Sequence, residues 1–186
     1  MKRIFDLIFA IFLLFLSILP MLIIALMVKL TSKGPVLFWS ERVGVNNTIF
    51  KMPKFRTMRL DTPAVATHLL RNADMYLTPI GGFLRKFSLD ELPQLFNIIS
   101  GDMSLVGPRP ALFNQYDLIE SRTKKNVHTL IPGVTGWAQI NGRDNLSIPV
   151  KVEFDEYYLK NRTLLLDSKI LLITLRKVIK KEGVSH

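Results

Sequence analysis

The feature that most constrains this chain is an uncharged apolar run near its N-terminus. The sequence from Leu7 to Val28, LIFAIFLLFLSILPMLIIALMV, contains no charged residue. As a helix rising 1.5 Å per residue it would be about 33 Å long, enough for the hydrocarbon core of a bilayer. A cleaved secretory signal needs a shorter apolar core and a small-residue cleavage site, which the following VKLTSKGPV does not supply. The run is therefore predicted to remain on the protein and to lie in lipid.

Two features bear on whether this run crosses the bilayer or returns to the side it entered. Pro20 lies near its middle, where it removes a backbone hydrogen bond and favours a kink. Lys2 and Arg3 precede the run and Lys29 and Lys33 follow it, so both flanks carry the charge that normally stays cytoplasmic. Prolines are also tolerated in ordinary spanning helices. The flanks alone leave a straight span and a re-entrant helix equally open.

The composition restricts the classes of ligand and of site. Lys and Arg outnumber Asp and Glu by 25 to 15, a net charge of +10, although 48% of the residues are hydrophobic. A basic and apolar chain suits nucleic acid, anionic lipid or a phosphorylated substrate. The chain has no cysteine, which excludes disulfides, zinc–thiolate sites and thiol nucleophiles. Its three histidines stand far apart, which argues against a histidine metal site.

Local patterns after residue 30 predict a mainly helical domain with one small β-hairpin. Residues 36–58, VLFWSERVGVNNTIFKMPKFRTM, contain apolar runs separated by GVNN, which suits a hairpin turn. The stretches VGPRPAL and IPGVTGWAQINGRDN are rich in Gly, Pro and Asn and are predicted to be ordered irregular loops. From Val152 onward the chain is predicted to be helical, with one apolar and one basic side. Such a helix either lies on an anionic bilayer or packs on its own domain with a solvated basic face.

The stretch RKFSLDELPQLFNIISGDMSLVGPRP, residues 85–110, places two carboxylates side by side at a predicted helix start. Either Ser88 caps the helix with Glu91 completing a capping box, or the helix starts at Asp90 and leaves Pro93 in the first turn. At both starts the helix dipole and free N–H groups favour an ionised Asp90. Acidic caps are common, so the local sequence alone favours a structural role.

Cationic residues near this pair favour a phosphate site. Arg85 and Lys86 precede it and Arg109 stands in GPRP, more phosphate-binding groups than a helix cap needs. Lys54 and Arg56, at the end of the predicted hairpin, are placed to join them.

Four motifs of this sequence resemble those of a known family. PKFRTM, GFLRKFSLDELPQLFNIISGDMSLVGPRP, PGVTGWAQINGR and FDEYYLKNRTLLLD occur in this order. Together they closely resemble the catalytic domain of the bacterial monotopic phosphoglycosyl transferases, also called the bacterial sugar transferase family. The resemblance runs from the apolar segment to near the C-terminus, and the chain resembles the small, stand-alone members.

The resemblance implies a reaction, a location and a fold. Members transfer a sugar-1-phosphate from a UDP-sugar to polyprenyl (undecaprenyl) phosphate, release UMP, and so initiate a surface glycan. They work on the cytoplasmic face of the bacterial inner membrane, with no nucleic acid partner. The expected fold is mainly α with a small β-hairpin (α+β). A re-entrant membrane helix would occupy residues 1–30, and a catalytic domain with interfacial amphipathic helices residues 31–186.

The resemblance also implies roles for individual residues. Asp90 would be the nucleophile that forms a phosphosugar-aspartate, and Glu91 its partner. Both would hold Mg²⁺, which an attack on an anionic diphosphate needs. Lys54, Arg85 and Arg109 would bind the substrate phosphates.

Other matched positions carry weaker expectations. Gln139, Asn141 and Arg143 match a loop that would contact nucleotide or phosphate, with loop rigidity as an equal alternative. The C-terminal motif contributes three matched positions without assigned chemistry, Asp155, Tyr158 and Asp167. Many members have Ser directly before the helix-breaking proline, whereas Leu19 precedes Pro20 here and the nearest serine is Ser17.

Two other functions remain as alternatives to the transferase. A Mg²⁺-dependent membrane phosphodiesterase would use the same carboxylates with water as acceptor. A non-enzymatic basic adaptor on the membrane surface would bind anionic lipid or nucleic acid with a steep salt dependence and leave the acidic pair without a role.

Overall fold

The computed structural model describes residues 1–63, 73–142 and 146–180. In chain order, with η for 3-10 helices, the elements are α1 (Lys2–Thr31), β1 (Leu37–Val43), η1 (Val45–Asn47), β2 (Ile49–Phe55), η3 (Ala73–Tyr76), α2 (Gly81–Lys86), η4 (Leu89–Gln94), α3 (Leu95–Ser100), β3 (Ser104–Val106), α4 (Tyr116–Lys124), η5 (Val127–Thr129), β4 (Gly133–Thr135), α5 (Trp137–Ile140), α6 (Ile148–Asn161) and α7 (Leu164–Lys180). The predicted mainly helical fold with a small β-hairpin is confirmed.

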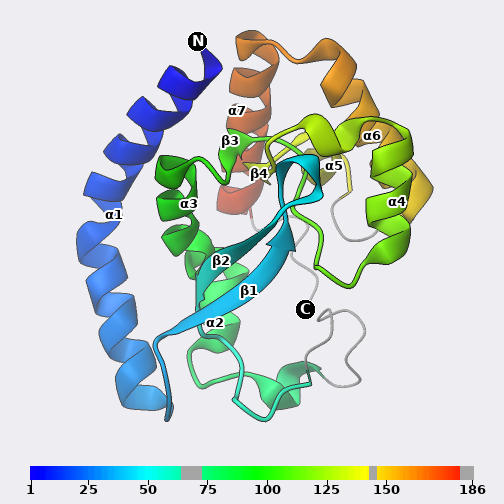
Figure 1. The fold of residues 1–186 in the computed structure, drawn as a ribbon. Coiled ribbons are helices and arrows are strands. Elements are labelled where there is room, and N and C mark those ends of the chain that lie inside the picture. Colours follow the sequence, from blue (N-terminus) through cyan, green and yellow to red (C-terminus); the bar gives the residue numbers. More distant parts are fainter. Residues whose placement is uncertain (64–72, 143–145, 181–186) are drawn as a thin grey trace.

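The predicted hairpin is formed by β1 and β2. The two strands pair antiparallel from Leu37 opposite Phe55 to Val43 opposite Ile49. The turn places Asn46 and Asn47 at φ 51° and 59°, in the left-handed region that asparagine tolerates better than most residues. The hairpin lies between α1 and α4 in Figure 1 and directs the end of β2 toward η4.

A second pair of strands corrects the expectation that both Gly- and Pro-rich motifs are irregular loops. β3 precedes the GPRP segment and pairs in parallel with β4, with Ser104 opposite Gly133 and Val106 opposite Thr135. A short helix, α5, follows β4. Three-residue strands carry too few side chains for a detectable alternation, so the composition of their flanking turns dominated the prediction.

Helix α1 is continuous through Pro20 and curves along one side of the molecule (Figure 1). It is long and apolar enough to cross a membrane by length and composition. The hydroxyl of Ser17 donates to the carbonyls of Leu13 and Leu14, a side-chain contact that often bends helices. Large apolar side chains along its outer face are exposed, including Phe12, Phe15, Leu19, Leu22 and Leu26.

The first turns of α1 are bound to the domain by polar contacts. The Lys2 ammonium lies 2.7 Å from Asp167 of α7, and Arg3 donates to the carbonyls of Ile98 and Ile99 at the end of α3. Asp6, which is buried, accepts from the Ser104 hydroxyl at 2.8 Å. The charges that precede the apolar run therefore anchor it, in addition to any effect on membrane orientation.

The other end of α1 contacts the same domain. Ile24 and Val28 pack with Phe55 and Leu84 in one apolar cluster. Just beyond the helix, buried Arg56 donates to Ser32 and to the carbonyl of Pro35. Arg56 is thus a link between α1 and the hairpin, and the expectation that it joins the phosphate site is wrong.

The helix predicted from Val152 onward is two helices, α6 and α7, separated at Arg162 and Thr163. Leu165, Leu172 and Leu175 of α7 are exposed, while Ile170 is fully buried, so α7 has both a core face and an exposed apolar stripe. Trp137 stacks on Tyr157 of α6 with ring centroids 5.2 Å apart, which gives this tryptophan a packing role.

Substituting Gly133 by Ala is expected to cost more than about 3 kcal/mol of folding free energy. An added Cβ would stand 2.0 Å from the backbone nitrogen of Gly107, and backbone cannot move aside without breaking the β3–β4 pair. Gly82→Ala in α2 is the matched control, because its Cβ would meet only the Leu77 side chain at 3.6 Å. Denaturant titration in detergent measures both variants; equal stabilities would contradict this account of the β3–β4 contact.

Candidate active site

The two adjacent carboxylates lie on η4, a 3-10 helix that leads directly into α3. Ser88 precedes η4 in the left-handed conformation, φ 55°, and its side chain makes no capping hydrogen bond. The capping-box alternative is therefore wrong, and the helix starts at Leu89, one residue before the alternative start at Asp90. Pro93 fits because it lies in η4, ahead of the first residue of α3. Because no capping box forms, the side chain of Glu91 is left for other partners.

Glu91 binds two cations that come from distant parts of the chain. Its Oε1 accepts from the Lys54 ammonium of β2 at 2.7 Å and from the Arg109 guanidinium at 3.0 Å. Burial alone would raise the pKa of Glu91, but the charges and hydrogen bonds of Lys54 and Arg109 hold it well below its ordinary value. Glu91 is therefore a permanent anion that fixes both cations.

Asp90 differs from its neighbour, because it is buried without a hydrogen bond to any described residue. Burial raises its pKa to about 6, and the negative charge of Glu91 adds to the rise. The charges of Lys54, Arg85 and Arg109 partly offset it. A carboxylate that is desolvated, near three cations and free of hydrogen bonds is suited to act as a nucleophile or a ligand.

Replacing Asp90 by Asn is expected to stabilise the ligand-free fold at neutral pH. A folded pKa of about 6, against an ordinary value of 3.8, means that ionised Asp90 opposes folding. Protonated Asp90 stabilises the fold relative to ionised Asp90 by on the order of 3 kcal/mol. This contribution is present below pH 4 and is lost as pH rises through 6. Denaturant titrations in EDTA at pH 4 and pH 7.5 should show that the variant has a larger free energy of unfolding than wild type only at the higher pH. An equal difference at both pH values would contradict the raised pKa.

The structure brings together most of the predicted phosphate-binding residues. Lys54 and Arg109 contact Glu91 directly. Arg85, on α2, lies close enough to influence the charge of Asp90, and its guanidinium also contacts the Met58 sulfur at 3.6 Å. Lys86 is exposed beside it. The site is therefore assembled from the hairpin, α2, η4 and the segment after β3.

The lower-ranked candidates have different outcomes. Gln139 of α5 is buried, and its amide nitrogen and oxygen find no hydrogen-bond partner among the described residues. Its oxygen lies 2.7 Å from where a Cβ of Gly136 would stand, so it is packed against the β4–α5 turn. Asn141 donates to the Trp137 carbonyl and has a local structural role. Arg143 lies outside the described residues.

The matched C-terminal positions Asp155, Tyr158 and Asp167 are buried and form polar pairs, one of them with Arg122, which the sequence did not single out. Arg122 of α4 pairs with Asp155 of α6 at 2.7 Å, and Tyr158 donates to Asp167 at 2.6 Å. Asp155, Tyr158 and Asp167 stand in a matched motif, which was the available signal. Arg122 lies in a polar surface-helix pattern that gives no sign of burial.

The acidic pair fits a magnesium ion shared with a substrate. Among the described residues no group of three or more Asp, Glu or His side chains is arranged to hold a metal. Asp90 has its carboxylate unbonded to those residues, and Glu91 uses only Oε1 for its two cations. Mg²⁺ commonly binds one or two carboxylates and completes its shell with substrate phosphates and water. The donor set therefore fits Mg²⁺ in the presence of a diphosphate.

Comparison with known proteins settles the family. The sequence profile of the bacterial sugar transferases matches residues 1–181. The chain belongs to this family. The sugar transferase EpsL of Bacillus subtilis strain 168, itself described as uncharacterized, is 44% identical over 186 residues, which cover all of this chain and 91% of EpsL.

Other relatives of this bacterial sugar transferase carry more specific descriptions. UDP-glucose:undecaprenyl-phosphate glucose-1-phosphate transferase of Escherichia coli strain K12 is 42% identical over 95% of this chain. UDP-N-acetylgalactosamine-undecaprenyl-phosphate N-acetylgalactosaminephosphotransferase of Aeromonas hydrophila is 39% identical over 86% of it. The chain spans only 40% and 39% of the lengths of those two proteins.

Proposed function

We propose that this bacterial sugar transferase moves a sugar-1-phosphate from a UDP-sugar to undecaprenyl phosphate and releases UMP. The observation that carries the proposal is that the adjacent carboxylates of Asp90 and Glu91 have different environments. Glu91 is fixed by two cations, while Asp90 beside it is desolvated, with its pKa raised to about 6. The descriptions of the relatives, which act on UDP-sugars and undecaprenyl phosphate, support the substrate classes.

In the first half-reaction the Asp90 carboxylate attacks the phosphorus next to the sugar. A bond forms between a carboxylate oxygen and phosphorus, and the bond from that phosphorus to the UMP oxygen breaks. The electron pair leaves with UMP. Lys54, Arg85 and Arg109 supply fixed positive charge for the diphosphate and the departing phosphate.

In the second half-reaction an oxygen of undecaprenyl phosphate attacks the same phosphorus. The bond to Asp90 breaks, the carboxylate is regenerated, and the product is the lipid diphosphate sugar. The covalent phosphosugar-aspartate implies ping-pong kinetics. Neither half-reaction consumes water. The buried position of Asp90 limits the access of water and so protects the acyl phosphate from hydrolysis.

Asp90 and Glu91 would hold Mg²⁺ together with the substrate phosphates. When bound, the ion supplies charge neutralisation that lets one anion approach another. Gln139 is proposed as a nucleotide or phosphate contact, supported by its unpartnered buried amide. Arg143 remains part of the same proposal.

The membrane arrangement that we propose is monotopic, with both ends of α1 on the cytoplasmic face of the inner membrane. Its support is that both ends contact one domain: Lys2 and Arg3 at the start, Ile24 and Val28 near the end. A helix that spanned the bilayer would leave only one of its ends on the side of the membrane where the domain lies. The exposed apolar stripe of α7 suits the interface of the same membrane.

Single cysteines at Ile4 and Lys33 test this arrangement cleanly, because the chain has no cysteine of its own. In sealed vesicles of one orientation, an impermeant maleimide is expected to label both positions or neither. Labelling of one position only, in vesicles whose orientation is verified, would contradict a re-entrant α1 and indicate a span.

The reaction is tested by UMP release from a panel of UDP-sugars with Mg²⁺, with and without undecaprenyl phosphate. The transferase predicts multiple turnovers only when the lipid is present. Lipid-independent turnover would instead indicate the phosphodiesterase, and absence of UMP release under both conditions would contradict the proposed function.

A further inference from the structure

We propose that Arg122 and Asp155 are positioning residues that fix the Arg109 guanidinium over Glu91. The inference deepens the proposed function and rests on it for the effect on catalysis. Neither residue contacts the acidic pair, so their action is through the backbone of the GPRP segment.

The backbone of that segment is held by hydrogen bonds at each carbonyl from Pro108 to Ala111. Pro108 accepts from the Gly133 amide at 2.9 Å, and Ala111 accepts from the Val43 amide, also at 2.9 Å. Pro110 accepts from the Arg42 guanidinium at 3.2 Å. The remaining carbonyl, that of Arg109, accepts from Arg122 Nη1 at 2.8 Å. The backbone of Arg109, the residue that contacts Glu91, is thus held by the side chain of Arg122.

Asp155 sets the direction in which Arg122 donates. Its Oδ2 accepts from both Nε and Nη2 of Arg122, at 3.0 and 2.7 Å. The guanidinium is planar and rigid, so these two bonds fix the plane and leave Nη1 directed at the Arg109 carbonyl. Asp155 and Arg122 are 1% and 8% exposed, so water does not replace either partner easily.

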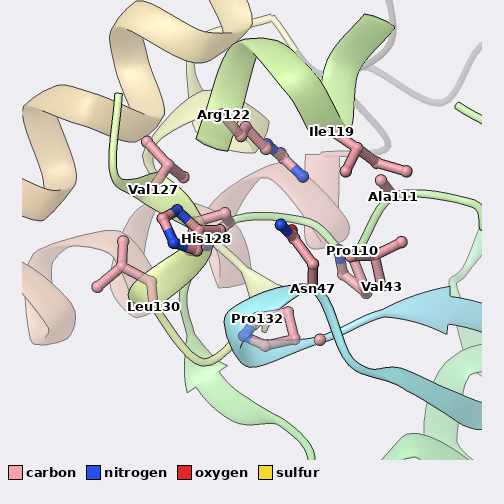
Figure 2. Close-up of a pocket in the computed structure, with 12 residues that line it drawn as sticks. Val43, Asn47, Pro110, Ala111, Ile119, Arg122, Val127, His128, Leu130 and Pro132 are labelled. Carbon is pink, nitrogen blue, oxygen red and sulfur yellow. The ribbon is translucent and has the colours of Figure 1, made fainter. Parts of the chain in front are cut away.

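Packing alone leaves the segment room to move. Figure 2 shows a small cavity bordered by Pro110, Arg122, His128 and Asn47, and Pro108 also lines it. The cavity contains neither Asp90 nor Glu91, so it lies behind the segment and outside the reaction site. Loss of the Arg122 contact removes the hydrogen bond to the Arg109 carbonyl, so the backbone there can shift toward this space and move the guanidinium.

The consequence for catalysis follows from the 3.0 Å contact between Arg109 and Glu91. A shift of about 1 Å in a substrate-positioning group can cost on the order of 100-fold in rate. Asp155→Asn is therefore expected to lower kcat/KM by about 10- to 100-fold. Arg122→Lys, which keeps the charge but loses the planar fork, is expected to act in the same direction.

A double-mutant cycle distinguishes positioning from general loss of stability. In full-length protein, with the UDP-sugar that wild type turns over, Asp155→Asn should lower kcat/KM by this factor. In an Arg109→Met background, Asp155→Asn should lower kcat/KM by less than about threefold, because the effect of Asp155 acts through Arg109. The same factor in both backgrounds would overturn the inference. Ile170→Ala, which removes buried side-chain volume from α7, controls for lost stability.

Hydrogen exchange of the backbone amides provides a readout independent of activity. Asp155→Asn and Arg122→Lys should raise exchange selectively in peptides covering residues 105–112. Ile24→Ala, which removes volume from the separate apolar cluster of α1, Phe55 and Leu84, should not. Unchanged exchange in that segment would overturn the inference even if activity falls. If wild type does not turn over any UDP-sugar, the proposed function fails, and exchange alone decides whether this pair holds the segment. Arg122→Lys serves as the test if Asp155→Asn does not fold.

Discussion

Asp90→Asn is expected to lower the rate of sugar-phosphate transfer by more than about 10³-fold while the protein stays folded and membrane-bound. Loss of a covalent nucleophile removes the reaction path itself, and such losses are among the largest known for single residues. Asparagine keeps the shape of the side chain but cannot form the acyl phosphate. The expected gain in stability at neutral pH separates this loss from unfolding.

Asp61→Asn is the matched control for this substitution. Asp61 is exposed and pairs with Arg59 on the surface, so removing its charge should leave turnover unchanged. Activity of Asp90→Asn within tenfold of wild type, after deamidation is excluded by mass, would contradict the assignment of Asp90 as nucleophile.

Glu91→Gln is expected to lower turnover by about 10²- to 10³-fold, with substrate turnover still measurable. Glu91 is the shared acceptor that holds Lys54 and Arg109 2.7 and 3.0 Å from one oxygen. Without its charge the two cations repel each other, and their contribution to the departing phosphate is weakened. Because Asp90 remains, the covalent adduct should still form slowly, which distinguishes a supporting anion from the nucleophile.

Glu120→Gln on α4 provides the comparison for Glu91→Gln. Glu120 pairs with Lys124 across an exposed helix surface, where such a pair contributes little. Steady-state kinetics and single-turnover adduct formation should be measured on both. Equal and small effects of the two substitutions would contradict a role for the Lys54–Glu91–Arg109 cluster.

Sequence reasoning succeeded where the signal is local or where motifs are long. The hairpin followed from strand-like runs around GVNN, and the turn asparagines do adopt left-handed backbone. The family resemblance predicts that Lys54 and Arg109 lie at the same site as the acidic residues, but not that both cations pair with Glu91. Local sequence could not have given this pairing, because the two cations come from opposite sides of η4 in the chain.

The failures share a physical cause, which is competition for side-chain partners across the fold. A capping box with Glu91 is one of the two helix starts that the local sequence allows, but Lys54 and Arg109 offer Glu91 stronger, charged partners. Lys2 and Arg3 were interpreted only as flanking charges, although Asp167 and the end of α3 bind them. The sequence places Arg56 close to Lys54, but Arg56 lies just past the end of β2, where Ser32 and the Pro35 carbonyl bind its guanidinium.

Intact-protein mass spectrometry of the detergent-solubilised chain, mixed with Mg²⁺ and a panel of UDP-sugars without lipid, tests the central claim most directly. The account predicts a mass gain of one sugar-phosphate with the correct donor, absent in Asp90→Asn and discharged when undecaprenyl phosphate is added. Absence of any adduct on wild type, despite UMP release once the lipid is added, would contradict the covalent route and indicate direct displacement.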